Sequence, residues 1–91
     1  MQGNAYYVST MSLIIYTKKG CPWCNDVLDF LHEKKVVFEE REVRENKTFF
    51  DEMVAKSGQT KAPTLDLDGV ILADTDKDAV ETFLKEHAMV R

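Results

Sequence analysis

The sequence predicts an α/β fold in which a four-stranded mixed sheet is flanked by three helices. Short apolar runs rich in β-branched residues alternate with segments of helical periodicity, in the order β-α-β-α-β-β-α. Strands separated by a helix pair in parallel through right-handed crossovers. The last two strands are joined instead by Asp68-Gly69, a strong two-residue hairpin signal that adds an antiparallel strand. The sheet should therefore contain both kinds of pairing.

The first half of the chain predicts a buried strand, an amphipathic helix and a second strand. Leu13-Ile14-Ile15-Tyr16 is a continuous apolar run, typical of a strand buried on both faces. A helix is expected over 22–34, where apolar side chains recur at helical spacing: Cys24, Val27, Leu28 and Leu31. Pro22 suits its first turn, where a missing N–H costs no hydrogen bond. The second strand is expected over 36–43, with charges in its outer half.

The second half predicts a helix, a hairpin and a final helix. The helix is expected over 47–57, with Gly58 as its C-terminal stop and an inward stripe of Phe50, Met53 and Val54. The hairpin strands cover 64–67 and 70–72. The final helix is expected over 76–88 and begins with the capping-box pattern Thr75-Asp76-Lys77-Asp78. Its inward residues would be Ala79, Val80, Phe83 and Leu84.

Length and composition indicate one compact domain and argue against nucleic-acid and membrane partners. The chain has 91 residues, of which 44% are hydrophobic and 31% charged, and its formal net charge is −4. We interpret residues 1–11, which end at a second methionine, as an N-terminal extension or tag, and 12–91 as a single domain. No basic cluster exceeds two residues, which argues against nucleic acid and anionic membranes. The chain also lacks an apolar run near the roughly 20 residues that span a bilayer, and a secretion signal.

The motif that carries chemistry is Cys21-Pro22-Trp23-Cys24, which follows the first strand and opens the first helix. At a helix N-terminus, unpaired N–H groups and the dipole favour a thiolate, and Lys18 and Lys19 add positive potential. Cys24 lies on the apolar stripe and should be more buried and less ionised. Cys21 would therefore attack a disulfide, and Cys24 would then attack Cys21 to resolve the mixed disulfide. With both cysteines in one motif and no export signal, the chemistry is expected to be cytoplasmic.

Two other interpretations of the cysteine pair fit less well. A zinc site needs two further ligands at suitable spacing, and only His32 and His87 are available, on separate predicted helices. A structural disulfide is unusual in a cytosolic chain. We therefore expect no metal, and we treat both histidines as surface or partly packed residues.

Two further segments could contribute to a binding site. Pro63 stands directly before a predicted strand, where it either begins an edge strand in trans or forms a cis bond in a tight turn. Asp74-Thr75-Asp76 precedes the final helix, whose N-terminus could bind a carboxylate or could simply be capped. The residues alone leave both alternatives open in each case.

Taken together, these features resemble the glutaredoxin family over about residues 12–88. The matching segments are residues 15–24, 38–40 and 57–64, followed by Asp68-Gly69 and Asp76. CxxC alone is weakly specific, but CPxC after a buried strand, with a Pro-containing turn about forty residues later, is strongly specific. The resemblance implies a thioredoxin-like fold, a cis bond at Pro63, and an enzyme that reduces protein disulfides and glutathione mixed disulfides with electrons from glutathione.

The resemblance also implies site residues and partners. Cys21 would be the nucleophile and Cys24 the resolving thiol, joined as a redox disulfide in the oxidised enzyme. The glutathione groove would comprise Lys18 and Gln59 near the glycine carboxylate, Trp23 as a wall, Ala62 beside cis-Pro63 as a strand-like backbone partner, and Thr75 and Asp76 at the γ-glutamyl end. Glutathione would be a co-substrate, and disulfide-containing or glutathionylated proteins would be the partners of a monomer.

Two departures from the family pattern affect the electron donor. Many glutaredoxins have Thr-Val-Pro where this chain has Lys61-Ala62-Pro63, and a Gly-Gly pair where it has Ala73-Asp74. Asp74 adds a negative charge near the expected glutathione carboxylate. Ala-Pro is similar to glutaredoxin-like donors that thioredoxin reductase reduces, for example to serve ribonucleotide reductase. That donor role is the first alternative, and a dimer bridging a [2Fe–2S] cluster through Cys21 and glutathione is the second.

Overall fold

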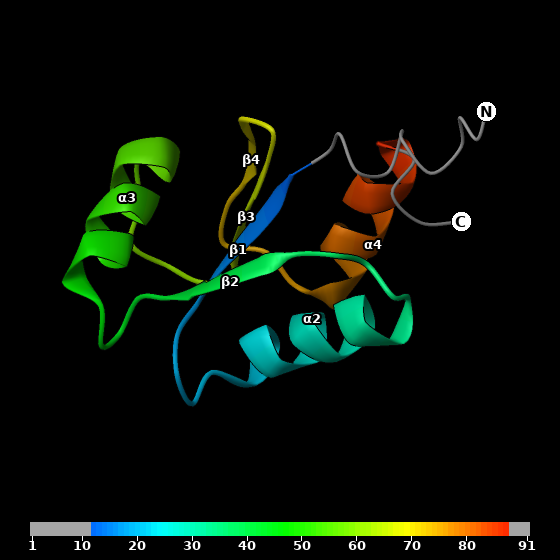
Figure 1. Cartoon of the computed structure of the whole chain (residues 1–91), viewed down its shortest axis with the longest axis horizontal. Coiled ribbons are helices and arrows are strands. Elements are labelled where there is room, and N and C mark those ends of the chain that lie inside the picture. The colour runs from blue at the N-terminus through cyan, green and yellow to red at the C-terminus, as the bar shows by residue number, and fades with distance from the viewer. Residues whose placement is uncertain (1–11, 88–91) are drawn as a thin grey trace.

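The computed structural model describes residues 12–87, and its central feature is a four-stranded sheet in the order β2-β1-β3-β4 (Figure 1). The strands are β1 (Leu13–Thr17), β2 (Glu39–Glu42), β3 (Thr64–Leu67) and β4 (Val70–Leu72), and the helices are α2 (Pro22–Glu33), α3 (Lys47–Ser57) and α4 (Lys77–Glu86). β1 pairs in parallel with β2 and antiparallel with β3, and β3 pairs antiparallel with β4. The predicted fold is thus confirmed.

β1 lies inside the sheet because both of its faces are apolar. Ile15 packs into the core cluster that α2 and α4 cover, whereas Tyr16 packs into a second cluster with Met53 of α3. Figure 1 shows the same arrangement, with α3 on one side of the sheet and α2 and α4 on the other. Burial of β1 on both faces, predicted from its continuous apolar run, is confirmed.

The helices bury most of the predicted apolar residues. The larger cluster contains Leu13, Ile15, Val27, Phe30, Leu31, Leu65, Leu67, Val80, Phe83 and Leu84. Phe30 was not part of the predicted stripe. On α3 only Met53 is fully buried, and Phe50 and Val54 are partly exposed. The prediction that Ala79 faces inward was wrong, because it lies in the exposed first turn of α4.

Several predicted boundaries differ from the structure, among them the end of β2, which lies at Glu42 and not at residue 43. The strand predicted from residue 36 begins only at Glu39, and the chain leaves α2 through a turn at Lys34 and Lys35. In this turn Lys35 has a φ of +57°, and the Val36 N–H donates to the Leu31 carbonyl at 3.0 Å. α2 ends one residue earlier than predicted, at Glu33.

α4 begins one residue later than predicted and is capped by Asp76. The Asp76 Oδ1 accepts a hydrogen bond from the Ala79 N–H at 2.9 Å, so the cap is Asp76 and not Thr75 of the predicted capping box. The helix ends at Glu86. This end comes two residues before the predicted one at residue 88. The predicted extension over 1–11 lies outside the described residues.

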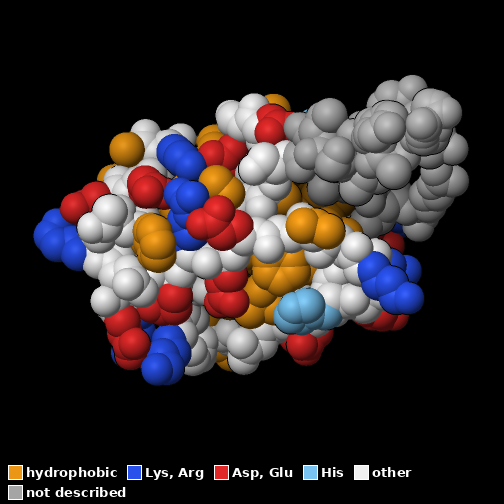
Figure 2. Space-filling view, in the orientation of Figure 1, with side chains coloured by type: hydrophobic (Ala, Val, Ile, Leu, Met, Phe, Trp, Pro, Cys, Tyr) orange, Lys and Arg blue, Asp and Glu red, His pale blue; other side chains and the backbone are white. Residues whose placement is uncertain are grey.

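The surface mixes charges of both signs. On the face seen in Figure 2, acidic and basic side chains alternate over β2 and α3. The ion pairs of Arg41 with Glu39 and of Lys47 with Asp51 belong to this pattern. Among residues 12–87, no helix has both the length and the apolar character that crossing a membrane requires.

Candidate active site

Cys21 lies at the end of the loop that joins β1 to α2, where it caps the helix. Gly20 makes the preceding turn with a φ of +84°, a conformation that favours glycine. The Cys21 N–H donates to the Lys18 carbonyl at 3.0 Å, and Pro22 occupies the first helical turn. The Cys21 Sγ accepts a hydrogen bond from the Cys24 N–H at 3.4 Å. The sulfur therefore lies at the positive end of the helix dipole, where a thiolate is favoured.

Cys24 lies on the inner face of α2, and only 1% of its surface is exposed. Its Sγ accepts a hydrogen bond from the Lys18 N–H at 3.4 Å. Burial is the main reason that the pKa of the Cys24 thiol is raised to about 12; the Lys18 N–H opposes this rise, and Cys21 and Glu40 add to it. Cys24 is therefore protonated at neutral pH, while Cys21 remains partly exposed.

The turn before β3 contains a cis peptide bond between Ala62 and Pro63. The Gln59 side chain braces this turn: its Nε2 donates to the Lys61 carbonyl at 3.0 Å and to the Thr64 Oγ1 at 3.1 Å. Thr64 Oγ1 in turn donates to the Lys61 carbonyl at 2.8 Å. The cis bond implied by the family resemblance is confirmed, and Pro63 itself is buried.

The start of α4 is tied to this turn through backbone contacts. The Thr75 N–H donates to the Pro63 carbonyl at 3.0 Å, and Thr75 is only 9% exposed. Asp74, just before it, has a φ of +50°, which lies in the left-handed region that favours glycine. Asp74 is exposed, and its backbone N–H approaches the Thr64 Oγ1 at 3.5 Å.

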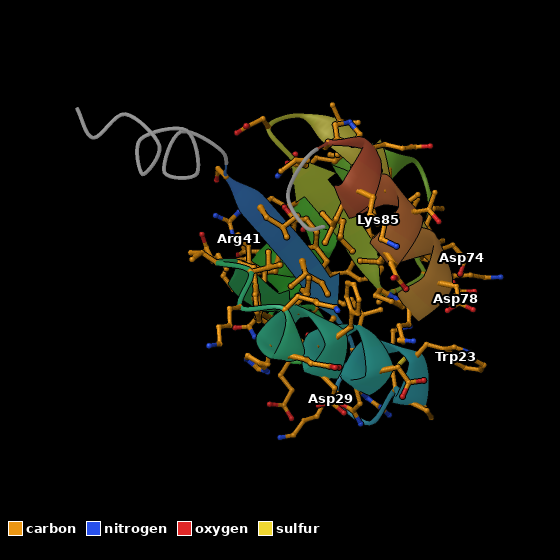
Figure 3. All side chains as sticks on the ribbon, turned by 90° about the vertical axis from the view of Figure 1, so that its right-hand side faces the viewer. Trp23, Asp29, Arg41, Asp74, Asp78 and Lys85 are labelled. Carbon is orange, nitrogen blue, oxygen red and sulfur yellow. The ribbon has the colours of Figure 1, made fainter. Side chains whose placement is uncertain are left out.

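Together these segments line a cleft of about 580 Å³ beside Cys21, within the range of small-ligand sites. Trp23 lines one side, and its surface is 61% exposed. Ala62 lines the cleft from the cis-Pro turn, and Asp74 lines it from the segment before α4. Figure 3 shows Trp23 and Asp74 projecting from the same side of the molecule, from two different elements.

Most of the residues predicted for the site do meet in this cleft: Lys18, Cys21, Trp23, Ala62, Thr75 and Asp76 all line it. Cys24 lies beneath Cys21 in α2, and Pro63 is buried behind Ala62. Gln59 does not line the cleft, because its side-chain amide is used within the cis-Pro turn. The predicted contact of Gln59 with a ligand carboxylate stays a prediction.

Sequence reasoning missed Arg44 as a cleft residue. Arg44 follows β2, and it reaches the cleft because β2 pairs in parallel with β1. Its guanidinium Nη1 donates to the Lys19 carbonyl at 3.0 Å. The signal that could have identified Arg44 was the predicted parallel pairing, since the C-terminal ends of paired parallel strands lie at the same sheet edge.

Comparison with known proteins agrees with the fold and the motif. The sequence model of the glutaredoxin family matches residues 13–72. Glutaredoxin 3 of Escherichia coli is 34% identical over 62 residues, which cover 68% of this chain and 75% of the relative. The crystal structure of a glutaredoxin from Archaeoglobus fulgidus matches with a TM-score of 0.71 at 20% identity, over 90% of this chain and 95% of that one.

A buckwheat glutaredoxin solved in complex with glutathione also shares the fold. It matches with a TM-score of 0.66 at 15% identity, over 90% of this chain and 76% of that one. These structural matches confirm the thioredoxin-like fold. Because the family model covers most of the described residues and includes Cys21 and Cys24, this chain belongs to the glutaredoxin family.

Proposed function

We propose that this protein, a thiol–disulfide oxidoreductase by family, takes electrons from glutathione and reduces both protein disulfides and glutathione mixed disulfides. The observation that carries the proposal is the pair of unlike thiols in one motif. Cys21 is partly exposed at the helix start and borders the cleft, whereas Cys24 is buried beneath it. This arrangement supports Cys21 as the attacking thiol and Cys24 as the resolving thiol.

The proposed reaction conserves thiols and disulfides at each step. The Cys21 thiolate attacks a protein disulfide, which breaks, and one protein thiol leaves. Cys24 loses its proton and attacks the Cys21 sulfur, which releases the second protein thiol and leaves a Cys21–Cys24 disulfide. Two glutathione thiols reduce this disulfide and leave as glutathione disulfide. With a glutathionylated protein, Cys21 alone takes up the glutathionyl group, and a second glutathione removes it.

The cleft supports glutathione as the co-substrate. In this proposal Ala62 offers its backbone to the cysteinyl part of the tripeptide, and Trp23 covers it. Thr75 and Asp76 hold the γ-glutamyl end, and Lys18 faces the glycine carboxylate. Such a reductase would act in the cytoplasm on disulfide-containing or glutathionylated proteins.

Glutathione-dependent reduction of a small mixed disulfide tests the proposal. Cys21→Ser should abolish turnover, whereas Cys24→Ser should keep deglutathionylation and lose reduction of protein disulfides. Equal activity of Cys21→Ser and the unmodified protein would refute the assignment. Titration of the reduced protein with glutathione should also shift the NMR signals of Ala62, Thr75 and Asp76.

The acidic charge of Asp74 favours a second candidate, a glutaredoxin-like donor reduced by thioredoxin reductase. Asp74 lines the cleft next to Thr75, where a glutathione carboxylate would bind. The negative charge of Asp74 would repel a glutathione carboxylate bound beside it and so weaken glutathione binding. Assays with each reductant alone separate the candidates: turnover with thioredoxin reductase and none with glutathione would select the second.

A further inference from the structure

The carboxylate of Glu42 lies at the loop before Cys21 and accepts three backbone hydrogen bonds. Glu42 is the last residue of β2 and pairs with Thr17, the last residue of β1, so it lies beside the loop that follows β1. Its Oε2 accepts from the Lys19 N–H at 2.7 Å and from the Arg44 N–H at 3.0 Å. Its Oε1 accepts from the Glu45 N–H at 2.8 Å.

Arg44 holds the other side of the same loop residue. Its guanidinium Nη1 donates to the Lys19 carbonyl at 3.0 Å. The N–H of Lys19 is therefore held by the last residue of β2, and its carbonyl by a residue just after β2. Partial burial opposes ionisation of Glu42, but the N–H groups of Glu45, Lys19 and Arg44 outweigh it and hold the pKa of this carboxyl below its usual range.

The loop fixed in this way contacts both cysteines. The N–H of Lys18, the neighbour of Lys19, donates to the Cys24 Sγ at 3.4 Å, and the Lys18 carbonyl accepts from the Cys21 N–H at 3.0 Å. Gly20 gives the loop conformational freedom that residues with side chains lack. Without an external constraint, the contacts of Lys18 with the two cysteines would be only one of several accessible arrangements.

We propose that Glu42 and Arg44 are positioning residues that clamp Lys19 and so hold Cys21 and Cys24 in the geometry for ring closure. Ring closure is the step in which Cys24 attacks the sulfur of a Cys21 mixed disulfide, and the proposal therefore rests on the proposed roles of the two thiols. Neither clamp residue exchanges a proton or an electron in this step. Their effect comes from alignment of the two sulfurs, to which intramolecular reactions are highly sensitive.

Reaction with an aromatic disulfide that releases one coloured thiolate per step isolates ring closure. Cys21 attacks the reagent and expels the first thiolate in a bimolecular phase. Cys24 then attacks the Cys21 sulfur and expels the second in a unimolecular phase that does not depend on reagent concentration. Neither phase uses glutathione, so a protein without glutathione turnover still tests the clamp.

Glu42→Gln and Arg44→Ala change the local charge in opposite directions. If the residues act by positioning, both variants slow the unimolecular phase by about tenfold or more, because misplacement by about 1 Å can cost about 100-fold. In the double variant the rate of this phase then falls by a smaller factor than the product of the two single effects, since both residues hold Lys19. If the residues act only by charge, loss of the Glu42 carboxylate favours the Cys24 thiolate and accelerates this phase, whereas loss of Arg44 slows it.

Glu45→Gln is the matched control. Glu45 pairs with the Lys19 side chain at 3.3 Å in an exposed ion pair, so the variant removes the same charge and leaves the clamp intact. We expect the unmodified rate of ring closure. Arg44→Lys keeps the charge at an exposed site, and slower closure in this variant supports the clamp even if Glu42→Gln fails to fold. Three outcomes would overturn the proposal. The first is an unchanged rate of ring closure in both Arg44→Lys and Arg44→Ala, and the second is faster closure in Glu42→Gln together with slower closure in Arg44→Ala. The third is a Glu45→Gln variant that slows closure as much as Glu42→Gln does.

Discussion

At the scale of single residues, the two cysteines differ in burial although they lie only about one helical turn apart. Cys21 caps α2 and borders the cleft, whereas Cys24 faces the core. The helix N-terminus favours negative charge at the first sulfur, and desolvation opposes it at the second. The different roles proposed for the two thiols therefore follow from their different positions in the first turn of the helix.

The raised pKa of Cys24 gives a prediction for its alkylation. In Cys21→Ser, the rate of reaction with iodoacetamide should stay low at neutral pH and rise only in alkaline solution, because the thiolate is the reacting form and burial, the largest cause of the raised Cys24 pKa, remains. Mass spectrometry at a series of pH values measures this rate. Cys21 in Cys24→Ser is the matched control and should react faster at neutral pH. Equal rates for the two single-cysteine variants at pH 7 would contradict the prediction.

Asp74 gives a prediction about ligand affinity. Its carboxylate lines the cleft, so we expect Asp74→Asn to tighten glutathione binding by about two- to fivefold, as for removal of an exposed like-charge contact. Asp74→Gly should behave similarly, because glycine also suits the φ of +50°. Titration calorimetry of the reduced protein measures the dissociation constant.

Asp78 provides the control for Asp74. It carries the same charge in the first turn of α4, but its side chain is 92% exposed and does not line the cleft. Figure 3 shows both carboxylates near the start of α4. Asp78→Asn should change affinity less than Asp74→Asn, and an equal change would show that the charge acts at long range and not within the cleft.

At the scale of elements, a polar network joins α3 to the sheet. Lys56 Nζ donates to the Tyr16 hydroxyl and to the Asp66 carboxylate, both at 2.7 Å, and the Tyr16 hydroxyl donates to Glu52 at the same distance. Burial of Asp66 opposes its ionisation, but Lys56 and the Gly69 N–H outweigh it and lower its pKa. The network thus ties the helix to β1 and to the β3–β4 hairpin.

Removal of Lys56 should destabilise the protein in a pH-dependent way. Lys56→Met leaves the buried Asp66 carboxylate without its ion-pair partner, and we expect the free energy of unfolding at pH 7 to fall by about 1–3 kcal/mol. Because the pKa of Asp66 is lower in the folded chain, its contribution is present above about pH 4 and is lost as pH falls. Urea unfolding at pH 7 and at about pH 2–3 should therefore show a smaller difference from the unmodified protein at the acidic pH.

Lys47→Met on the same helix is the control for Lys56→Met. Its ion pair with Asp51 is exposed, so we expect a loss of less than about 0.5 kcal/mol at either pH. A loss as large as that of Lys56→Met would mean that the helix, and not the network, is responsible.

At the scale of the whole molecule, two apolar clusters on opposite faces of one sheet support the cleft. α2 is capped by Cys21, contains Cys24, and is held to the sheet by the cluster that contains Val27, Phe30 and Leu31. The same cluster holds α4 through Val80, Phe83 and Leu84. The two helices that border the cleft thus share one core.

Truncation in this core should lower the stability of the molecule as a whole. Leu31→Ala should reduce the free energy of unfolding by about 2–5 kcal/mol, because Leu31 is fully buried and a cavity would remain. Chemical unfolding monitored by circular dichroism measures the change. Val37→Ala, at a side chain that is 78% exposed, should lie within about 0.5 kcal/mol of the unmodified protein. A small effect of Leu31→Ala would mean that the core closes around the missing side chain.

Local sequence patterns were sufficient to predict the secondary-structure elements and the position of the two cysteines. The apolar run of β1, the helical stripe of α2 and the Asp68-Gly69 turn are local patterns whose structure depends on neighbouring residues, and the structure confirms each. The position of Cys21 at a helix start followed from the same local order. The prediction that the second strand includes Val36 to Phe38 was wrong: despite their strand propensity these residues precede β2, and the Val36 N–H bonds back to the Leu31 carbonyl of α2.

The way in which distant segments meet around Cys21 depends on strand register and packing, which local patterns do not specify. Ala62 of the cis-Pro turn and Asp74 before α4 line the same cleft as Cys21, although about 40 or more residues separate them from it. Arg44 and Glu42 reach the loop before Cys21 only through the parallel pairing of β1 and β2. Local sequence patterns encode periodicity and caps, whereas contacts between segments 20 or more residues apart depend on strand register and packing.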